Sequence, residues 1–413
     1  MNDKNRGDDL VHNSSFTTHN SLVPRLRFPE FREAGEWEEK PLGKLLSIGN
    51  GRDHKHLSSG DIPVYGSGGY MRSVNDYLYD GESVCIGRKG TIDNPVFLTG
   101  KFWTVDTLFY TYAFRGCVPL FVYLLFQNIN WRNHNEAGGV PSLSKSNIEK
   151  ISVLTPEVDE QRKIASCLSS LDTLIAAQAD KLDALKTHKK GLMQQLFPRE
   201  GETVPRLRFP EFREAEEWQK STLEQLVAIR SGGTPSKANP EFWNGSIPWV
   251  SAKDMKQFFL NDTEDHISIA AVDDGAKIAS AGTFLMLIRG MTLLKDVPIC
   301  VLRREMSFNQ DVKALQPKEN VDGLFLALSL VGSKQRLRLM VSLAGHGTGR
   351  LNTDELKALE LLTPQPAEQQ KIAAFLSSLD TLIAAQTDKL DALKSHKKGL
   401  MQQLFPSPKA MAA

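Results

Sequence analysis

The chain is 413 residues long, a length that holds two or three domains of ordinary size. Hydrophobic residues make up 41% of it and charged residues 24%, a composition typical of a soluble globular protein. The 50 lysines and arginines are balanced by 49 aspartates and glutamates, which excludes a strongly basic coat for nucleic acid but not a locally basic face.

Cysteine spacing and hydropathy further narrow the class of protein. The four cysteines are far apart and form no Cys-x-x-Cys pair, which argues against a zinc ribbon or a disulfide framework and favours the reducing cytoplasm. Residues 1–20 are polar and lack the apolar core of a signal peptide, so we expect a tail there. No apolar run reaches the roughly eighteen residues of a membrane span, so we expect no contact with a membrane.

The sequence contains two internal repeats. Val23–Trp37 recurs as Val204–Trp218 with fourteen of fifteen positions identical, and Glu160–Pro198 recurs as Glu368–Pro406 with 34 of 39 identical. The two copies of the first repeat start 181 residues apart, and the two copies of the second repeat start 208 residues apart. The segments between the repeats therefore differ in length, and they also differ in sequence. We call the repeated segments the frame and the variable segments the inserts. Two unlike inserts in one frame indicate a protein that recognises two different things, with a duplication that left one copy idle as the alternative.

The repeats predict the following domain order. A tail at 1–20 precedes a first domain at 21–155, a helix at 156–198, a linker at 199–203, a second domain at 204–363, a second helix at 364–406 and a tail at 407–413.

Both inserts have the pattern of α+β domains. The first contains short β-prone runs broken by glycine, such as IPVYGSGGY and SVCIGRKGTI, followed by the apolar run PLFVYLLF, which predicts a buried helix. The second contains GGTPSKANPEFW, AGTFLMLIRG and AGHGTGR, which again predict strands joined by exposed polar loops.

The repeated segments that end in KKGLMQQLFP predict two long helices. Thr155–Pro156 and Thr363–Pro364 have the form of an N-cap followed by proline at the first helical position, and Pro198 and Pro406 end the pattern. Each helix carries a seam whose spacings alternate between four and three, as in a two-helix coiled coil. The expected pairing residues are Ile164, Leu168, Leu171, Ile175, Gln178, Leu182 and Leu185, continued by Lys189, Leu192 and Leu196, and then Ile372, Leu376, Leu379, Ile383, Gln386, Leu390 and Leu393, continued by Lys397, Leu400 and Leu404.

We expect the two helices to pair with each other as an antiparallel coiled coil about a pseudo-twofold axis. Gln178 and Gln386 hold matching places in the middle of the two seams, and we expect them to meet and fix the register, as single polar seam residues do. A homodimeric coiled coil is the alternative.

Glycine-rich loops in the inserts supply candidate DNA-binding residues, because glycine permits close backbone approach and polar side chains contact phosphates or base edges. Arg88, Arg289 and Arg350 are suited to guanine, and Asn309 and Gln310 to adenine. The full set is Ser67, Arg88, Lys89, Thr234, Ser236, Lys237, Lys253, Arg289, Asn309, Gln310, His346, Thr348 and Arg350. Taken singly, each of these is also explained by a solvated turn or a structural salt bridge.

The sequence carries no motif for catalysis or for a metal. It has no phosphate-binding GxxxxGK[ST], no HExxH and no GxSxG, and Asn239–Phe242 (NPEF) departs from the NPP[YF] of adenine methyltransferases at its third position. We therefore expect a binding protein without catalytic residues, metal or cofactor of its own.

The layout resembles the specificity subunit of type I restriction–modification systems over about residues 20–406. The resemblance rests on VPRLRFPEF before each insert, on TPEVDEQRKIASCLSSLD and TPQPAEQQKIAAFLSSLD at the helix starts, and on KKGLMQQLFP at their ends. Within the inserts, YGSGG, IGRKGTI and FWTVDTLFY, and then GGTPSKANPEFW, IPWVSAKDM and AGHGTGR, are also similar to that family.

The resemblance implies two α/β target recognition domains that each read one half of a bipartite site on double-stranded DNA, with the helices setting the gap between the halves. It also implies two methylation subunits docked on the helices, which bring S-adenosylmethionine, and restriction subunits that join through them and bring ATP and Mg²⁺. The alternatives from other classes are a coiled-coil adaptor that presents two protein-binding domains and, less favoured, a self-contained methyltransferase or nuclease.

Overall fold

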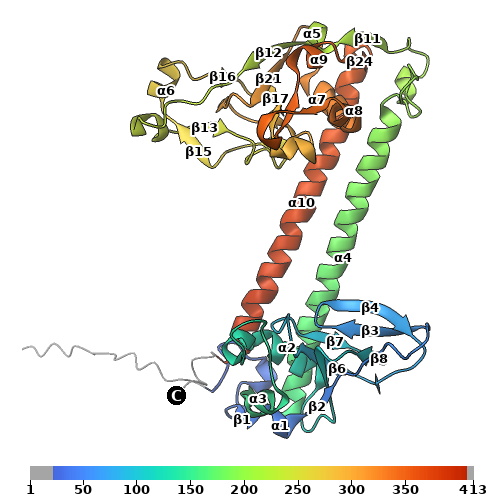
Figure 1. Cartoon of the computed structure of the whole chain (residues 1–413), viewed down its shortest axis with the longest axis vertical. Helices are drawn as coiled ribbons and strands as arrows, with labels where there is room; N and C mark the ends of the chain where they lie inside the picture. The colour runs from blue at the N-terminus through green and yellow to red at the C-terminus, as the bar shows by residue number, and fades with distance from the viewer. Residues whose placement is uncertain (1–21, 407–413) are drawn as a thin grey trace, which may run out of the picture. The chain divides into compact units, whose positions relative to one another are not determined.

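A computed structural model describes residues 22–406, and the tails expected at 1–20 and 407–413 lie outside these residues. The chain folds into two compact units. The first unit comprises the described residues up to Ala179 and those from Lys389 onward, and the second unit comprises Asp180–Asp388. Each unit therefore combines one insert with the beginning of one long helix and the end of the other (Figure 1).

The first insert forms two four-stranded sheets and three short helices. One sheet has the order β2-β9-β6-β7 and the other β4-β3-β8-β5. The strands are β2 Ser47–Asn50, β3 Ile62–Gly66, β4 Gly69–Val74, β5 Tyr79–Asp80, β6 Ser83–Gly87, β7 Val96–Leu98, β8 Lys101–Thr104 and β9 Leu108–Tyr112. The helices are α2 Pro119–Asn128, η2 Trp131–His134 and α3 Lys145–Lys150. The run PLFVYLLF forms α2 as predicted, with proline in its first turn and five apolar side chains buried.

The second insert is a larger mixed domain with three sheets. Their orders are β12-β21-β17-β19-β14, β15-β13-β20-β16 and β18-β23-β22. The strands are β12 Val227–Ser231, β13 Ile247–Val250, β14 Phe259–Leu260, β15 Asp265–Ile267, β16 Ile278–Ala279, β17 Phe284–Leu287, β18 Arg289–Gly290, β19 Ile299–Leu302, β20 Met306–Phe308, β21 Val312–Pro317, β22 Val341–Leu343 and β23 Gly349–Leu351. The helices are η4 Pro240–Trp243, α6 Ile269–Asp273, η5 Met291–Leu294, α7 Gly323–Gly332, α8 Lys334–Leu339, η6 Gly345–Gly347 and α9 Thr353–Lys357.

Each insert is closed at its ends by an antiparallel pair of strands. In the first unit β1 (Glu38–Pro41) pairs with β10 (Ser152–Thr155), and in the second β11 (Gln219–Thr222) pairs with β24 (Glu360–Thr363). The same short elements flank these pairs in both units: η1 Pro29–Phe31 and α1 Leu42–Leu45 in the first, and η3 Pro210–Phe212 and α5 Leu223–Leu226 in the second. The two frames therefore fold alike around inserts that do not.

The long helices are α4 (Val158–Leu196) and α10 (Pro366–Leu404). The prediction that they begin at Pro156 and Pro364 was wrong by two residues. Thr155 and Thr363 are not N-caps, because each is the last residue of a paired strand, and the hydroxyls of both point to the partner strand's main chain at Glu38 and Gln219. Strand pairing thus extends the chain up to the proline, and the helix starts after it.

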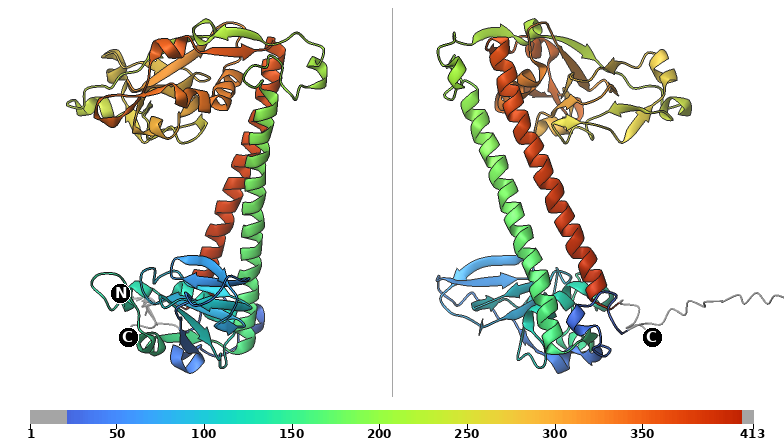
Figure 2. Two further views of the ribbon diagram at one scale, coloured as in Figure 1. Left: turned by 45° about the vertical axis from the view of Figure 1, so that its right-hand side comes forward. Right: turned by 180° about the vertical axis from the view of Figure 1, so that it is seen from behind.

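The ends of the two helices pack antiparallel within each unit. In the first unit Leu404 and Phe405 lie in one apolar cluster with Ile164 and Leu168, and in the second Leu196 lies in one cluster with Ile372. Figure 2 shows the last turns of α10 beside the elements of the first unit. All the predicted seam residues are buried or half-buried, including Gln178 and Gln386 at mid-seam. That these two glutamines meet and fix the register stays a prediction.

Two lysines of the seam form ion pairs within the units. Lys397 Nζ lies 2.6 Å from a carboxylate oxygen of Asp172 in the first unit, and Lys189 Nζ lies 2.5 Å from one of Asp380 in the second. Both lysine side chains are only 14% exposed. A seam position that carries lysine is therefore matched by a carboxylate on the helix beside it.

An aromatic cluster joins the frame to the helix end in each unit. The ring of Phe405 stacks on Phe121 of α2 and meets Trp37 edge-on, with centroids 5.5 and 5.8 Å apart. In the second unit Phe197, Phe325 and Trp218 take the corresponding places, with Phe197 centroids 5.4 and 6.1 Å from the other two. Each insert thus packs against the end of the other repeat's helix.

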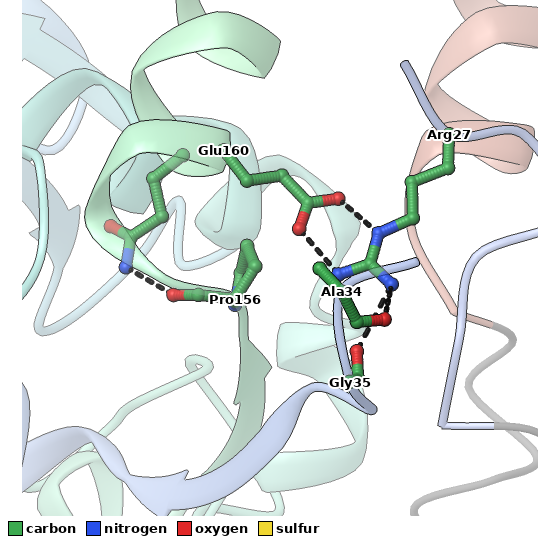
Figure 3. A network of polar contacts seen from close by, with 6 residues as sticks. Arg27, Ala34, Gly35, Pro156 and Glu160 are labelled. Atoms are coloured by element: carbon green, nitrogen blue, oxygen red, sulfur yellow. Dashed lines mark hydrogen bonds and ion pairs between the residues drawn. The ribbon is translucent and has the colours of Figure 1, made fainter. Parts of the chain in front are cut away.

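A buried arginine–glutamate pair fixes the start of each long helix, and Figure 3 shows the pair of the first unit. Arg27 forms a two-pronged ion pair with Glu160, at 2.8 and 2.6 Å, and also donates to the carbonyls of Ala34 and Gly35. The side chains of Arg27 and Glu160 are 7% and 2% exposed. Hydrogen bonding to the Glu160 carboxylate raises the pKa of Arg27. Arg208 and Glu368 repeat this arrangement at 2.8 and 2.7 Å.

The next residue of each helix attaches the insert. Gln161 accepts a hydrogen bond from the main-chain N–H of Val118 at 3.0 Å and donates to the carbonyls of Gly116 and Pro156 at 3.1 and 2.8 Å. Val118 is the residue before the first turn of α2, so the glutamine bonds the beginning of that helix.

Gln369 repeats the attachment in the second unit. It accepts from the N–H of Asp322, the residue before α7, at 2.9 Å, and donates to Pro364 and Asn320. Gln161 is fully buried and Gln369 is 3% exposed. Two inserts of unlike sequence are therefore attached at equivalent places by the same side chain.

We predict that Glu160→Gln destabilises the first unit by about 3 kcal/mol, because it leaves the Arg27 guanidinium buried without its counter-charge. Amide hydrogen exchange, read separately for the two units, measures this. Glu157→Gln is the matched control, since Glu157 is exposed and directly precedes α4. Equal exchange in the two variants would show that the pair contributes nothing.

Candidate nucleic-acid interface

Three candidate residues of the first insert gather around Thr107. Arg88 and Lys89 follow β6 in an exposed turn, and the N–H of Arg88 donates to the Thr107 carbonyl at 2.8 Å. The N–H of Ser67 points to the Thr107 hydroxyl at 3.4 Å. Gly90 continues the turn with φ +91°, where other residues are strained. The turns that contain Ser67, Arg88 and Thr107 are separate in the sequence and together form one polar surface.

A groove of about 720 Å³ lies beside this surface in the first insert. It is lined by residues 66–71, which comprise the turn between β3 and β4 and the strand ends beside it, by 53–55 and by 105–107. Tyr70 on its rim is 62% exposed. Ser67, one of the predicted DNA-binding residues, lines this groove. Tyr70 also lines it and was not predicted, although in the sequence YGSGGY it directly follows a glycine turn.

In the second insert, candidate residues of two loops lie together. The hydroxyl of Thr234 is 2.5 Å from the side-chain oxygen of Gln310. Ser236 and Lys237 are exposed in the same loop as Thr234. Asn309, by contrast, is 9% exposed, and its side-chain oxygen accepts the N–H of Asp311 at 3.1 Å, so it stabilises a turn.

Lys253 is already paired with carboxylates. Its ammonium group lies 2.9 Å from Asp265 and 3.1 Å from Glu264, and hydrogen bonding to these carboxylates, first Asp265 and then Glu264, raises its pKa. Its charge is therefore balanced within the domain, unlike that of Lys89, which forms no ion pair with any residue in the range 22–406.

The remaining candidates belong to the small sheet of β18, β23 and β22. Arg289 and Arg350 lie on paired strands of it and are exposed, and Thr348 lies in the turn that precedes β23. His346 lies in η6, and its side chain is not among those that the structure describes.

Burial raises the pKa of Cys85 and of Cys300 to about 12, so neither thiol is ionised near neutral pH. Within residues 22–406 no three His, Cys, Asp or Glu side chains gather as metal ligands. In that same part of the chain no helix is both long and apolar enough to cross a membrane.

Comparison with known proteins gives the class of the molecule. The family model described as type I restriction modification DNA specificity domain matches residues 34–187 and again residues 215–395, one match for each repeat. The chain therefore belongs to the family of type I restriction–modification specificity proteins.

Two relatives carry matching descriptions. The EcoR124I/EcoR124II specificity subunit of a type I restriction enzyme from Escherichia coli is 33% identical over 183 residues, 43% of this chain and 45% of the relative. The MjaVIII specificity subunit from Methanocaldococcus jannaschii is 24% identical over 355 residues, 79% of this chain and 77% of the relative. The match thus spans less than half of the first relative and about three quarters of the second.

Solved structures share the fold. The S subunit of a type I restriction–modification system from M. genitalium superposes with a TM-score of 0.66 and 13% identity, covering 93% of this chain and 99% of that one. A chain from a study of complex assembly in a type I system superposes with a TM-score of 0.54 and 14% identity, covering 91% and 97%. The expected fold, two α/β recognition domains with two long interacting helices, is confirmed.

We predict that Lys89→Ala reduces the salt dependence of DNA binding by the complex that contains this chain, whereas Lys253→Ala leaves it unchanged. An unpaired lysine that neutralises one phosphate contributes about 0.9 to the slope of log K against log salt concentration. Titrations of the two variants at several salt concentrations measure this slope. Equal slopes for both variants and the native protein would remove Lys89 from the interface.

Proposed function

We propose that this chain is the DNA-specificity subunit of a type I restriction–modification complex and that each insert reads one half of an asymmetric, bipartite target on double-stranded DNA. The two long helices set the unspecified spacer between the halves and dock two methylation subunits. Restriction subunits join through the methylation subunits, and the assembly acts on DNA in the cytoplasm.

One observation carries this proposal. Gln161 and Gln369 attach two inserts of unlike sequence to near-identical frames at equivalent places, the residues before α2 and α7. A repeated frame with two different inserts is suited to presenting two different binding surfaces, each in the same orientation on its helix.

The residue types of this chain suit it to bind DNA, and we assign catalysis to the partner subunits. The candidate DNA-binding side chains are arginine, lysine, serine, threonine, asparagine and glutamine, types that bind phosphates and base edges. We assign the methyl donor S-adenosylmethionine, ATP and Mg²⁺ to the partner subunits, and no catalytic residue to this chain. The net charge of +1 is in accord with partners that share the neutralisation of phosphates.

Mapping of methylated adenines tests the proposal directly. Cells that express this chain with its methylation subunit should contain a split, asymmetric motif with a fixed gap, and the motif should vanish when this chain is deleted. A co-purifying complex that methylates no such motif would instead favour the adaptor alternative.

We predict that four residues added to each helix lengthen the spacer by one or two base pairs without changing either half-site. Four helical residues add about 6 Å, close to the rise of two base pairs, and about 40° of rotation, close to the roughly 35° by which one base pair turns. Residues 179–182 and 387–390 are suitable for duplication, because they occupy matching places in the two repeats.

The same adenine mapping reads the outcome. Insertion into one helix only is the control, because it puts the two seams out of register and should abolish methylation. A half-site whose sequence changes when both helices are lengthened would contradict the role of the helices as a spacer.

A further inference from the structure

Two of the exposed arginines lie directly opposite each other in the second unit. In the sheet β18-β23-β22, Arg289 is paired with Arg350, and Arg350 is paired with Ser342 on the other side. Residues opposite each other in an antiparallel sheet project from the same face. These three residues therefore form one row, which we call the arginine row.

The packing of the neighbouring residues on β23 shows which face of the sheet carries the arginine row. A Cβ atom at Gly349 would lie 2.8 Å from Cβ of Leu293 and 3.1 Å from a methyl group of Val341, so this position packs against η5. Leu351 is 1% exposed. Gly349 and Leu351 alternate with Arg350 along β23, so the arginine row faces outward.

The arginine row places two positive charges side by side without compensation. Like charges opposite each other in a sheet are destabilising. Among residues 22–406 neither Arg289 nor Arg350 forms a salt bridge or a hydrogen bond through its guanidinium, although lysines nearby in the chain, such as Lys334, are paired with carboxylates. Two like charges that lie opposite each other, with no carboxylate of the described residues between them, are suited to an external acceptor.

The shape of the sheet selects the acceptor. Strands β22 and β23 form a ribbon closed by a short turn, and the two-residue strand β18 pairs with the other edge of β23. In the turn the Ala344 N–H bonds the Thr348 carbonyl at 2.8 Å and Gly347 has φ +71°. A two-stranded ribbon fits the major groove of B-DNA, and a guanidinium there pairs bidentately with O6 and N7 of guanine.

Resting on the function proposed above, we propose that the β22–β23 ribbon enters the major groove of one half-site and that Arg350 and Arg289 read guanines there. The two strands are about 4.8 Å apart and neighbouring base pairs about 3.4 Å, so the two side chains reach adjacent base pairs. The half-site read by the second insert therefore contains two adjacent G·C pairs, one contacted by Arg350 and the other by Arg289.

Guanine analogues in the complete methylation complex test this inference. Replacing the contacted guanine by 7-deazaguanine removes N7, and it should weaken binding of the native complex by roughly 5- to 150-fold, the range for one bidentate pair. Inosine, which keeps O6 and N7, should have no such effect, since it differs from guanine only in the minor groove.

The variant Arg350→Ala should bind the natural duplex more weakly by a similar factor and lose its sensitivity to 7-deazaguanine at one position only. Arg289→Ala should do the same at the adjacent position. Arg338→Ala is the matched control, because it removes an exposed arginine of α8 outside the row and should keep the full sensitivity at every guanine.

The outcomes are distinct. A uniform loss of affinity in Arg350→Ala, with sensitivity to 7-deazaguanine retained at every position, would mean phosphate contact and overturn the inference. A native half-site without guanine, or sensitivity to inosine rather than to 7-deazaguanine, would overturn it as well. A native complex that methylates no split motif would instead overturn the proposed function itself.

Discussion

The structure of each unit depends on two consecutive buried side chains, a glutamate and a glutamine, at the start of its long helix. Glu160 holds Arg27 of the frame, and Gln161 holds the main chain in front of α2. Buried polar groups of this kind are costly unless all their partners are present. The segment that contains Arg27, the long helix and the insert must therefore assemble in one arrangement. This arrangement determines the orientation of the insert on its helix.

Periodicity and repetition made most of the architecture predictable. The alternation of four and three along the seams predicted both helices, and the apolar run at 119–126 predicted α2, since these signals are local. The helix starts were wrong, because a Thr–Pro pair suits an N-cap and a strand end equally well. The attachments through Gln161 were not predicted, because their partners lie 43 and 45 residues away in the sequence.

The candidate interface was predictable by residue type and not by arrangement. Ser67, Arg88 and Lys89 do share one surface, because the strands that precede them lead into turns at Thr107. Asn309 bonds Asp311, its near neighbour in the chain, in a turn that the residue types alone did not indicate. The carboxylates that pair with Lys253 lie farther along the chain, so its neighbourhood in the sequence did not reveal them. The pairing of Arg289 with Arg350 joins residues far apart in the chain, and only the register of the strands brings them together.

The attachment of the inserts has an evolutionary consequence. On the side of the insert, Gln161 and Gln369 bond only main-chain atoms, which every amino-acid sequence provides. Any other domain with a helix that starts at the same place can make the same main-chain hydrogen bonds to the glutamine. Because the two frames are nearly identical, the two attachment sites are equivalent. Such a chain can acquire a new preference by exchanging a whole module in one recombination event, with no need to re-evolve the joint.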